Sequence, residues 1–204
     1  MFIARHGYGH TLAPHEINYR ANLWALRELG VGEVIAVNSV GGIGADLGPG
    51  TLAVPDQIID YTSGRPHTYF EGADQPVVHV DFTWPLDQAV RKSLLQAARA
   101  AGLAIVDGGV YAATNGPRLE SAAEIVRLER DGATMVGMTG MPEASLAREL
   151  GLPYAMLVLV ANWAAGRGNS AQRIDLEEII DILDSGMVRV RRIIEHRAMR
   201  LASV

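Results

Sequence analysis

Polar side chains suited to anion binding stand near the start of the chain. The stretch "ARHGYGH" places Arg5, His6 and His10 directly after a short apolar run, which predicts a strand over residues 1–6. Side chains at strand ends build the sites of α/β sheets, and the planar fork of arginine matches phosphate oxygens. The pattern predicts anion binding by Arg5, and the alternative is an ordinary surface arginine.

An amide interrupts the most apolar stretch of the chain. The run "YAMLVLVAN" is typical of a buried strand, yet it ends on Asn162 where the strand meets a loop. An amide both donates and accepts hydrogen bonds, whereas an ionised carboxylate only accepts. Asn162 is therefore a candidate for ligand binding, and the alternative is that its side chain only caps its own loop.

Three loops rich in small residues follow predicted strands. In "VNSVGGIGADLGPG" the glycines permit a dinucleotide-binding loop, a tight turn, or a cradle in which backbone amides near Ser39 and Gly41 face an anion. The loops "TNGPRLES" and "GMTGMPEAS" each combine a hydroxyl with an acid. Their acids, Glu120 and Glu143, are candidates for chemistry, and the alternative is solvent exposure at helix starts.

Composition excludes several classes of function. Of the 204 residues, 49% are hydrophobic and the formal net charge is −5, which suits an α/β domain and disfavours nucleic-acid or anionic-membrane partners. The sequence has no cysteine, so disulfide scaffolds and thiolate metal sites are excluded and we expect no metal. The start lacks the pattern of a secretory signal, and no apolar run reaches the ~20 residues of a membrane span. We expect a cytoplasmic protein.

Strand-like and helix-like patterns alternate along the chain. Apolar runs bounded by turn residues predict strands over residues 1–6, 33–40, 50–62 with a break at Pro55, 104–116 as a pair turning on Gly108 and Gly109, 134–138, and 154–162. Helical spacing predicts helices over residues 15–30, 86–102, 121–132, 141–151, and 175–200 with Gly186 as a candidate kink. The alternation predicts one α/β domain, residues 1–204, built as an αβα sandwich around a mixed sheet.

Six segments carry a resemblance to a known family. They are "RHGYGHTLAPHEINYRAN", "AVNSVGG", "PDQIIDYTSGRPHTYF", "HVDFTWP", "NGPRLESAAE" and "VGMTGMPEASLAREL". In this order they resemble the trimeric purine nucleoside phosphorylase and methylthioadenosine phosphorylase family, and most closely its S-methyl-5′-thioinosine phosphorylases. The resemblance covers essentially the whole chain. It implies a nucleoside phosphorylase fold, a homotrimer, and phosphorolysis of a purine nucleoside with inorganic phosphate as co-substrate and no other cofactor.

The resemblance assigns roles on the phosphate and sugar side. Four residues match phosphate-side positions, namely Arg5, His6, Ser39 and Thr139. Met138 matches the methionine beneath the ribose. His79, in "VVHVDF", matches a histidine that a neighbouring subunit lends to the 5′ pocket.

On the base side, Leu119 and Glu120 match positions that face the purine, with Leu119 replacing a common phenylalanine. The adenine-specific members carry a T-D-x-D pattern after the last strand, and here the two acids are replaced by Asn162 and Ala164. An amide can donate to a C6 carbonyl and accept from N7–H as the base leaves. The resemblance therefore implies catalysis by Asn162 and Glu120 on a hypoxanthine-type base, with S-methyl-5′-thioinosine as the expected substrate.

The resemblance also predicts a shortened N-terminus. The family begins with a strand and a G-G-[ST]-G loop about 50 residues before "RHG", which this chain is expected to lack. Without that loop, a noncatalytic nucleoside-binding homologue is one alternative. Three others also stay open: a methylthioadenosine phosphorylase, an inosine or guanosine phosphorylase, and a nicotinamide-dependent oxidoreductase.

Overall fold

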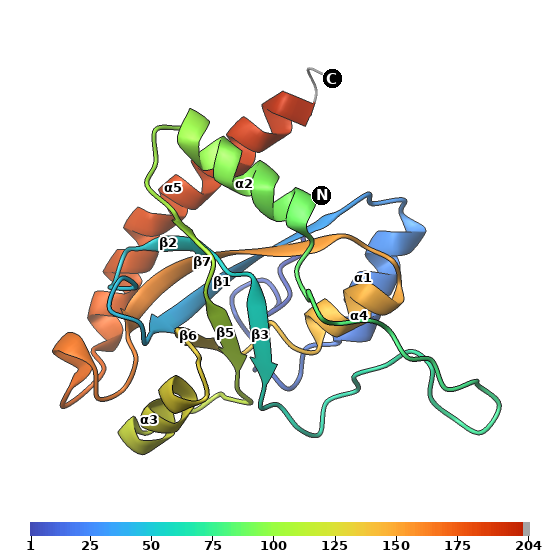
Figure 1. Ribbon diagram of the computed structural model, residues 1–204, viewed down its shortest axis with the longest axis horizontal. Helices are drawn as coiled ribbons and strands as arrows, with labels where there is room; N and C mark the ends of the chain where they lie inside the picture. The colour runs from blue at the N-terminus through green and yellow to red at the C-terminus, as the bar shows by residue number, and fades with distance from the viewer. Residues whose placement is uncertain (202–204) are drawn as a thin grey trace.

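The computed structural model describes residues 1–201, which fold around one mixed sheet (Figure 1). Its seven strands are β1 (Val34–Gly42), β2 (Leu52–Val54), β3 (Gln57–Asp60), β4 (Val106–Asp107), β5 (Val110–Ala113), β6 (Met135–Gly137) and β7 (Tyr154–Trp163). They lie side by side in the order β3-β5-β6-β1-β7-β2-β4. Parallel and antiparallel pairs both occur, so the predicted α/β class with a mixed sheet is confirmed.

Helices cover both faces of this sheet. Within the described residues they are α1 (Tyr19–Glu28), α2 (Gln88–Ala100), α3 (Ala122–Arg130), α4 (Glu143–Glu149) and α5 (Leu176–Leu201), with a 3-10 turn η1 (Gly168–Ser170). Helices α2 and α5 contact each other and one face of β7, whereas α4 contacts β7 and α1 (Figure 1). None of the helices described is long and apolar enough to cross a bilayer.

Strand β7 is the centre of the core. Its first eight residues are buried, because alternate side chains of a strand point to opposite faces and here both faces are covered. Met156 packs in the cluster that includes residues of α1 and α4, and Leu157 packs in the cluster of α2 and α5. Strand β1 pairs in parallel with β7 from Val34 opposite Tyr154 to Gly42 opposite Trp163, with a register shift between Val40 and Gly41.

The sheet is curled by two bends in neighbouring segments. Pro55 separates β2 from β3, and Gly108 with Gly109 separates β4 from β5. Both glycines have positive φ, +100° and +115°, which side chains rarely allow. Strand β2 pairs with β4, and β3 pairs with β5. The two bent segments therefore lie beside each other, with β2 and β4 at one end of the strand order and β3 and β5 at the other. The prediction that residues 104–116 turn back as a strand pair is therefore wrong, since β4 and β5 do not pair with each other.

Three other element predictions differ from the structure. Residues 1–4 have no regular structure and residues 5–10 form turns, so the predicted first strand is absent from the described residues; an apolar run becomes a strand only where a neighbour completes its hydrogen-bond ladder. Helix α1 begins at Tyr19 instead of residue 15, because the side chain of Asn18 accepts from the backbone of Ala21 and caps it there. Helix α5 is continuous through Gly186.

Gly186 is a close-packing position instead of a kink. A Cβ added there would lie 2.4 Å from Cδ2 of Leu159, and Leu159 is buried in the core. Because Gly186 has no side chain, α5 can pack closely against β7 at this point.

Candidate active site

A buried polar cluster lies where the end of β6 meets the middle of β1. Thr139, just after β6, is buried, and its hydroxyl lies 3.0 Å from the side-chain amide of Asn38 on β1. When the oxygen of that amide faces Arg5, it accepts from Thr139 Oγ1 at 3.0 Å and from Arg5 Nη2 at 3.1 Å, while the nitrogen donates to the carbonyl of Ala36. This orientation satisfies both ends of the buried Asn38 amide.

Tyr111 on β5 forms hydrogen bonds with the loop that follows β6 and carries Thr139. Its hydroxyl accepts from the backbone N–H groups of Thr139 and Gly140, each at 3.3 Å. Burial raises the pKa of Tyr111, so the hydroxyl stays protonated. The loop after β6 is thus fixed by a neutral group inside the core.

Arg5 reaches this cluster from the N-terminal turn. Nη1 donates to Oε1 of Glu143 at 2.7 Å, and Nη2 donates to the carbonyl of Val37 at 2.7 Å. The hydroxyl of Tyr154 donates to the same Glu143 oxygen at 2.9 Å. Burial by itself lowers the pKa of Arg5, but the charge of Glu143 together with smaller effects of Tyr154, Tyr111 and Tyr19 outweighs burial, and the pKa is raised. Arg5 is therefore a fixed cation.

Glu143 is not a solvent-facing acid at a helix start, and that alternative for it is wrong. Its residue exposure is 6%, and it balances the charge of Arg5. A buried carboxylate is stable only with such partners. Tyr154, Tyr111 and Asn38 were missed as site residues by the sequence predictions, and Glu143 was named only as a candidate acid without a role. The signal was present as polar residues inside apolar runs, in "AVNSV" and "MPEASLA".

His6 lies beside Arg5 with a defined tautomer. Its Nδ1 lies 2.9 Å from the carbonyl of Leu12, so a neutral ring must carry its proton on Nδ1 and present Nε2 as an acceptor. Burial lowers the pKa of His6, and the nearby charge of Arg5 acts in the same direction. His6 and His10 are spaced as an HxxxH pair and their rings stack at 4.6 Å. Among residues 1–201, no group of three or more His, Cys, Asp or Glu could hold a metal ion.

The loops that follow β5 and β6 touch each other. A Cβ on Gly116 would lie 2.3 Å from Sδ of Met138, so the sulfur fills the space that this glycine leaves. Glu120 is half-buried and accepts from the hydroxyl of Thr114 at 2.6 Å. Leu119 is 42% exposed. The structure therefore brings Met138 and Thr139 close to the loop that carries Leu119 and Glu120.

The end of β7 joins the same region. Asn162 pairs in register with Gly41 of β1, and a Cβ on Gly41 would lie 3.4 Å from Cβ of Ala164. A Cβ on Gly166 would lie only 2.7 Å from Cβ of Ala122, so the loop after β7 rests on the start of α3. Asn162 Nδ2 donates to the carbonyl of Trp163 at 2.6 Å, which is the local loop bond of the alternative interpretation.

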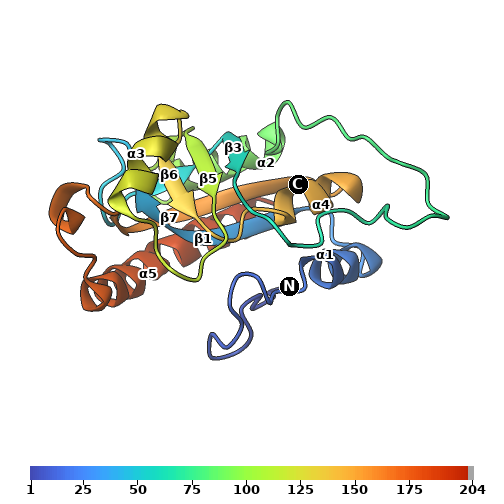
Figure 2. The ribbon, with the colours of Figure 1, turned by 90° about the horizontal axis from the view of Figure 1, so that it is seen from below.

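Two predicted residues lie apart from this cluster. His79 is exposed, in the segment of residues 72–84 that has no helix or strand and extends away from the sheet (Figures 1 and 2). Ser39 is exposed on β1 and adjoins the buried Asn38 in sequence, so its side chain points to the opposite face of the strand.

The glycine-rich loop after β1 does not have the structure of a dinucleotide-binding loop. A tight turn, with Leu47 N–H bonded to the carbonyl of Gly44 at 2.9 Å, leads to strand β2 instead of a helix. A dinucleotide loop must open a helix whose N-terminus meets the pyrophosphate. That interpretation is wrong, and the tight turn is confirmed for this part of the loop.

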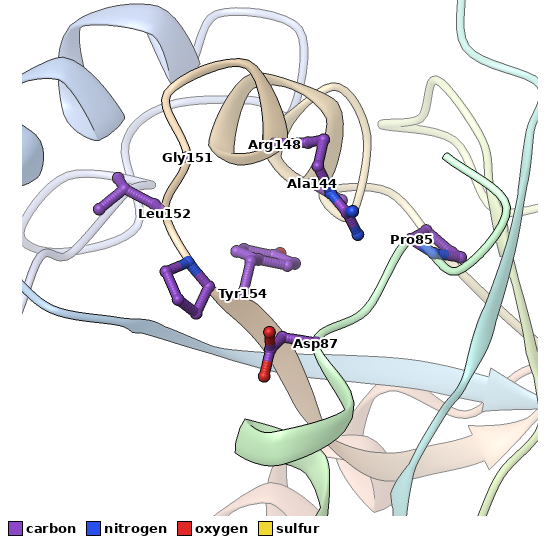
Figure 3. A pocket seen from close by; sticks show the side chains of 8 residues that line it. Pro85, Asp87, Ala144, Arg148, Gly151, Leu152 and Tyr154 are labelled. Carbon is purple, nitrogen blue, oxygen red and sulfur yellow. The ribbon is translucent and has the colours of Figure 1, made fainter. Parts of the chain in front are cut away.

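Tyr154 also lines a pocket of about 240 Å³. Figure 3 shows Arg148, Asp87 and Tyr154 around it. Its remaining lining comes from Pro85, Ala144, Gly151, Leu152 and Pro153. None of the predicted site residues lines this pocket, and it shares only Tyr154 with the polar cluster described above.

Comparison with known proteins decides the family. Residues 1–196 match the family model described as the Phosphorylase superfamily. The chain belongs to this family. A relative from Pseudomonas syringae pv. tomato named "Probable S-methyl-5'-thioinosine phosphorylase" is 53% identical over 191 residues, which is 94% of this chain and 77% of the relative.

Other matches agree in class. A 6-oxopurine nucleoside phosphorylase of Pyrococcus furiosus is 46% identical over 187 residues, 89% of this chain and 70% of that protein. The solved structure of methylthioadenosine phosphorylase from Schistosoma mansoni in complex with adenine superposes with a TM-score of 0.92 at 30% identity, covering 98% of this chain and 75% of that one. The predicted family, fold and enzyme class are confirmed: this phosphorylase is an enzyme of the purine nucleoside phosphorylase type.

Proposed function

We propose that this phosphorylase cleaves S-methyl-5′-thioinosine with inorganic phosphate, giving hypoxanthine and 5-methylthioribose 1-phosphate. The observation that carries the proposal is the base-side arrangement. The amide of Asn162 lies near the end of β7, and the apolar Ala164 follows it in the loop that contacts the start of α3, two residues after Glu120. The names of the Pseudomonas syringae and Pyrococcus furiosus relatives support a 6-oxopurine substrate.

On the phosphate side, Arg5, His6 and Thr139 are proposed to hold the anion. Arg5 supplies a fixed positive charge, and the hydroxyl of Thr139 turns from Asn38 to donate to a phosphate oxygen. Bound phosphate then attacks C1′ while the C1′–N9 bond breaks and its electrons pass to the purine. Met138, packed over Gly116, is proposed to support the sugar. Positioning and charge stabilisation supply the catalysis. A phosphate contact by Ser39 stays a prediction, because its side chain points to the face of β1 opposite Asn38.

On the base side, Asn162 is proposed to meet two atoms of the departing purine. Its Nδ2 leaves the carbonyl of Trp163 and donates to O6. As the C1′–N9 electrons pass to the ring, N7 takes a proton from solvent, and the amide oxygen accepts from the N7–H that forms. Exchanging one hydrogen bond for another costs little. Glu120, held by Thr114, accepts from N1–H, and Leu119 packs against the ring. Ala164 offers no hydrogen bond to an adenine amino group.

Substrate preference tests this proposal. Adenine lacks N1–H and would leave buried polar groups unpaired at about 1–3 kcal/mol each, so two such losses separate the substrates by roughly 30-fold to well over 1,000-fold in kcat/KM. We expect kcat/KM for methylthioinosine to exceed that for methylthioadenosine by such a factor. A ratio near one, or a preference for the amino purine, would defeat the assignment.

Substitution sharpens the test. Asn162→Asp combined with Ala164→Asp should move the preference toward methylthioadenosine, because an ionised carboxylate accepts from the amino group but cannot donate to O6. The matched control for the Asn162→Asp half of this variant is Asn18→Asp, which adds the same single negative charge at the exposed N-cap of α1. Asn and Asp are about equally good N-caps, so the control should leave both the substrate ratio and the stability unchanged.

Methylthioadenosine is the second candidate substrate. The observation in its favour is the match in fold to the Schistosoma mansoni structure that holds adenine. The same comparison of kcat/KM values distinguishes it from the first candidate.

We further propose a cytoplasmic homotrimer of this single phosphorylase domain, in which His79 reaches the 5′ pocket of a neighbouring subunit. The support is the extended segment around His79, where Val77 is 80% exposed. Light scattering should give about three times the chain mass of 21.9 kDa. Mixing inactive His79→Ala and Asn162→Ala subunits should restore part of the activity, and an active monomer would overturn the proposal.

A further inference from the structure

Arg65 is a buried cation that the proposed chemistry does not use. It lies in the segment after β3 and is 6% exposed. No carboxylate of residues 1–201 forms an ion pair with it, in contrast to the buried Arg5 and Arg91. Its guanidinium instead lies 5.6 Å from the centre of the Tyr19 ring and donates to the Tyr19 hydroxyl at 3.3 Å.

The main hydrogen bonds of Arg65 go to the backbone of two separate loops. Nη1 donates to the carbonyls of Met138 and Met141, at 2.8 and 2.6 Å. Nη2 donates to the carbonyls of Asn115 and Thr114, at 2.9 and 3.4 Å. One planar group therefore spans the loop after β6 and the loop after β5.

These two loops carry opposite ends of the proposed site. The loop after β6 presents Met138 and Thr139 toward the sugar and the phosphate. The loop after β5 leads from Thr114, which binds the carboxylate of Glu120 at 2.6 Å, to the purine side. The spacing between the two loops therefore sets the distance between the phosphate contacts and the base contacts.

We propose that Arg65 is a positioning residue that holds these loops at the separation the reaction requires. The inference rests on the proposed phosphorylase function. A guanidinium suits the task because its nitrogens form a rigid planar fork, so that Nη1 serves one loop while Nη2 serves the other. A lysine keeps the charge but brings one compact ammonium on a flexible stem, which cannot fix two loops relative to each other.

The substitution that tests this is Arg65→Lys. We expect kcat to fall roughly 10- to 100-fold, because a misplacement of about 1 Å can cost 10²-fold in rate. The KM values for phosphate and nucleoside should change much less, since each loop retains its own side chains. Hydrogen exchange of the backbone amides in residues 114–120 and 137–141 should become faster in the variant.

Arg91→Lys is the matched control. Arg91 is 7% exposed and donates to the carbonyls of Pro55 and Val54, at 2.7 and 3.0 Å, and to Asp107 at 2.7 Å. Like Arg65, Arg91 is a buried arginine that donates to backbone carbonyls, and it joins α2 to the end of β2. It contacts neither loop of the site. Its loss should lower Tm but leave kcat and the exchange of the two loops unchanged.

The outcomes separate this inference from the proposed function. If Arg65→Lys and Arg91→Lys lose Tm alike and keep kcat and loop exchange, Arg65 is merely structural and the inference fails. If the wild-type protein shows no phosphorolysis, the proposed function fails, and the exchange data alone decide whether Arg65 holds the loops. If Arg65→Lys does not fold, Arg65→Gln, whose planar amide reaches one loop only, is measured against Arg91→Gln with the same criteria.

Discussion

Replacing Glu143 with Gln removes the charge that balances Arg5, and two effects of opposite sign should follow. The carboxylate of Glu143 accepts from Arg5 at 2.7 Å and from Tyr154 at 2.9 Å. The side chains of the ion pair are only 14% and 8% exposed. Gln keeps the shape and one acceptor oxygen but no charge, so the guanidinium remains buried without a counter-charge. The folded protein becomes less stable, while an anion beside Arg5 becomes more favourable.

The expected loss of stability follows from the burial of the pair. Removing one partner of a buried pair costs about 3–5 kcal/mol, and Gln retains an acceptor, so we expect about 3 kcal/mol. For a chain of this size, about 2–4 °C per kcal/mol makes this roughly 6–12 °C in Tm. If the variant binds phosphate with a tenfold lower Kd, saturating phosphate would raise its free energy of unfolding by about 1.4 kcal/mol more than that of the wild type.

Thermal unfolding with and without phosphate, at one ionic strength, measures both effects. The control is Glu71→Gln, which removes the charge from the exposed pair of Glu71 with Arg20, whose side chains are 55% and 34% exposed. Exposed pairs contribute about 0–1 kcal/mol. Equal losses in the two variants, or a phosphate response in Glu143→Gln no larger than in the wild type, would refute the reasoning.

Three further outcomes are expected. Gly186→Ala should lower the free energy of unfolding by about 1–3 kcal/mol, because the added Cβ would lie 2.4 Å from Leu159. This loss should appear despite a gain in helix propensity of about 1 kcal/mol. A urea midpoint no lower than that of the exposed control Ser185→Ala would contradict it. Ser121→Ala removes half of the capping box of α3 and should cost about 1 kcal/mol, seen as a Tm about 2–4 °C lower. Burial lowers the pKa of His6 below its value in the unfolded chain, so the unfolded state binds more protons and the free energy of unfolding should fall as pH drops below about 6.5. Urea unfolding at several pH values should show that this part of the pH dependence is missing in His6→Gln. A pH profile unchanged by the substitution would exclude His6 as its source.

Much of the fold could be predicted from local pattern. The apolar run that forms β7, the amphipathic α2 and α3 and the break at Pro55 were predicted close to their observed positions, because burial and turn chemistry act through neighbours in sequence. The run over residues 1–6 failed for the opposite reason, since a strand depends on a partner that local pattern does not specify. The pair turning on Gly108 and Gly109 failed because a bent segment and a hairpin have the same local signature.

The proposed site divides in the same way. The polar residues that the motifs single out, including Arg5, Thr139, Glu120 and Asn162, were predicted as candidates because their types are unusual beside buried strands. Their roles stay predictions, as does that of His79. For Glu143 the sequence left a chemical role and solvent exposure both open, because at a helix start a paired buried acid and a solvated acid have the same sequence context.

The sequence by itself determined the family, the α/β class and the enzyme class, because motifs in fixed order carry the identity of residues that face a common ligand. Only the tertiary structure decided which polar groups meet. Arg5 and Glu143 are 138 residues apart, Asn38 and Thr139 are 101 apart, and Arg65 reaches carbonyls 49 to 76 residues away. Such contacts arise because β6 pairs with β1 on one side and with β5 on the other in the curled sheet. Buried charges and amides must find partners, and here they find them between segments far apart in sequence, which no local pattern can express.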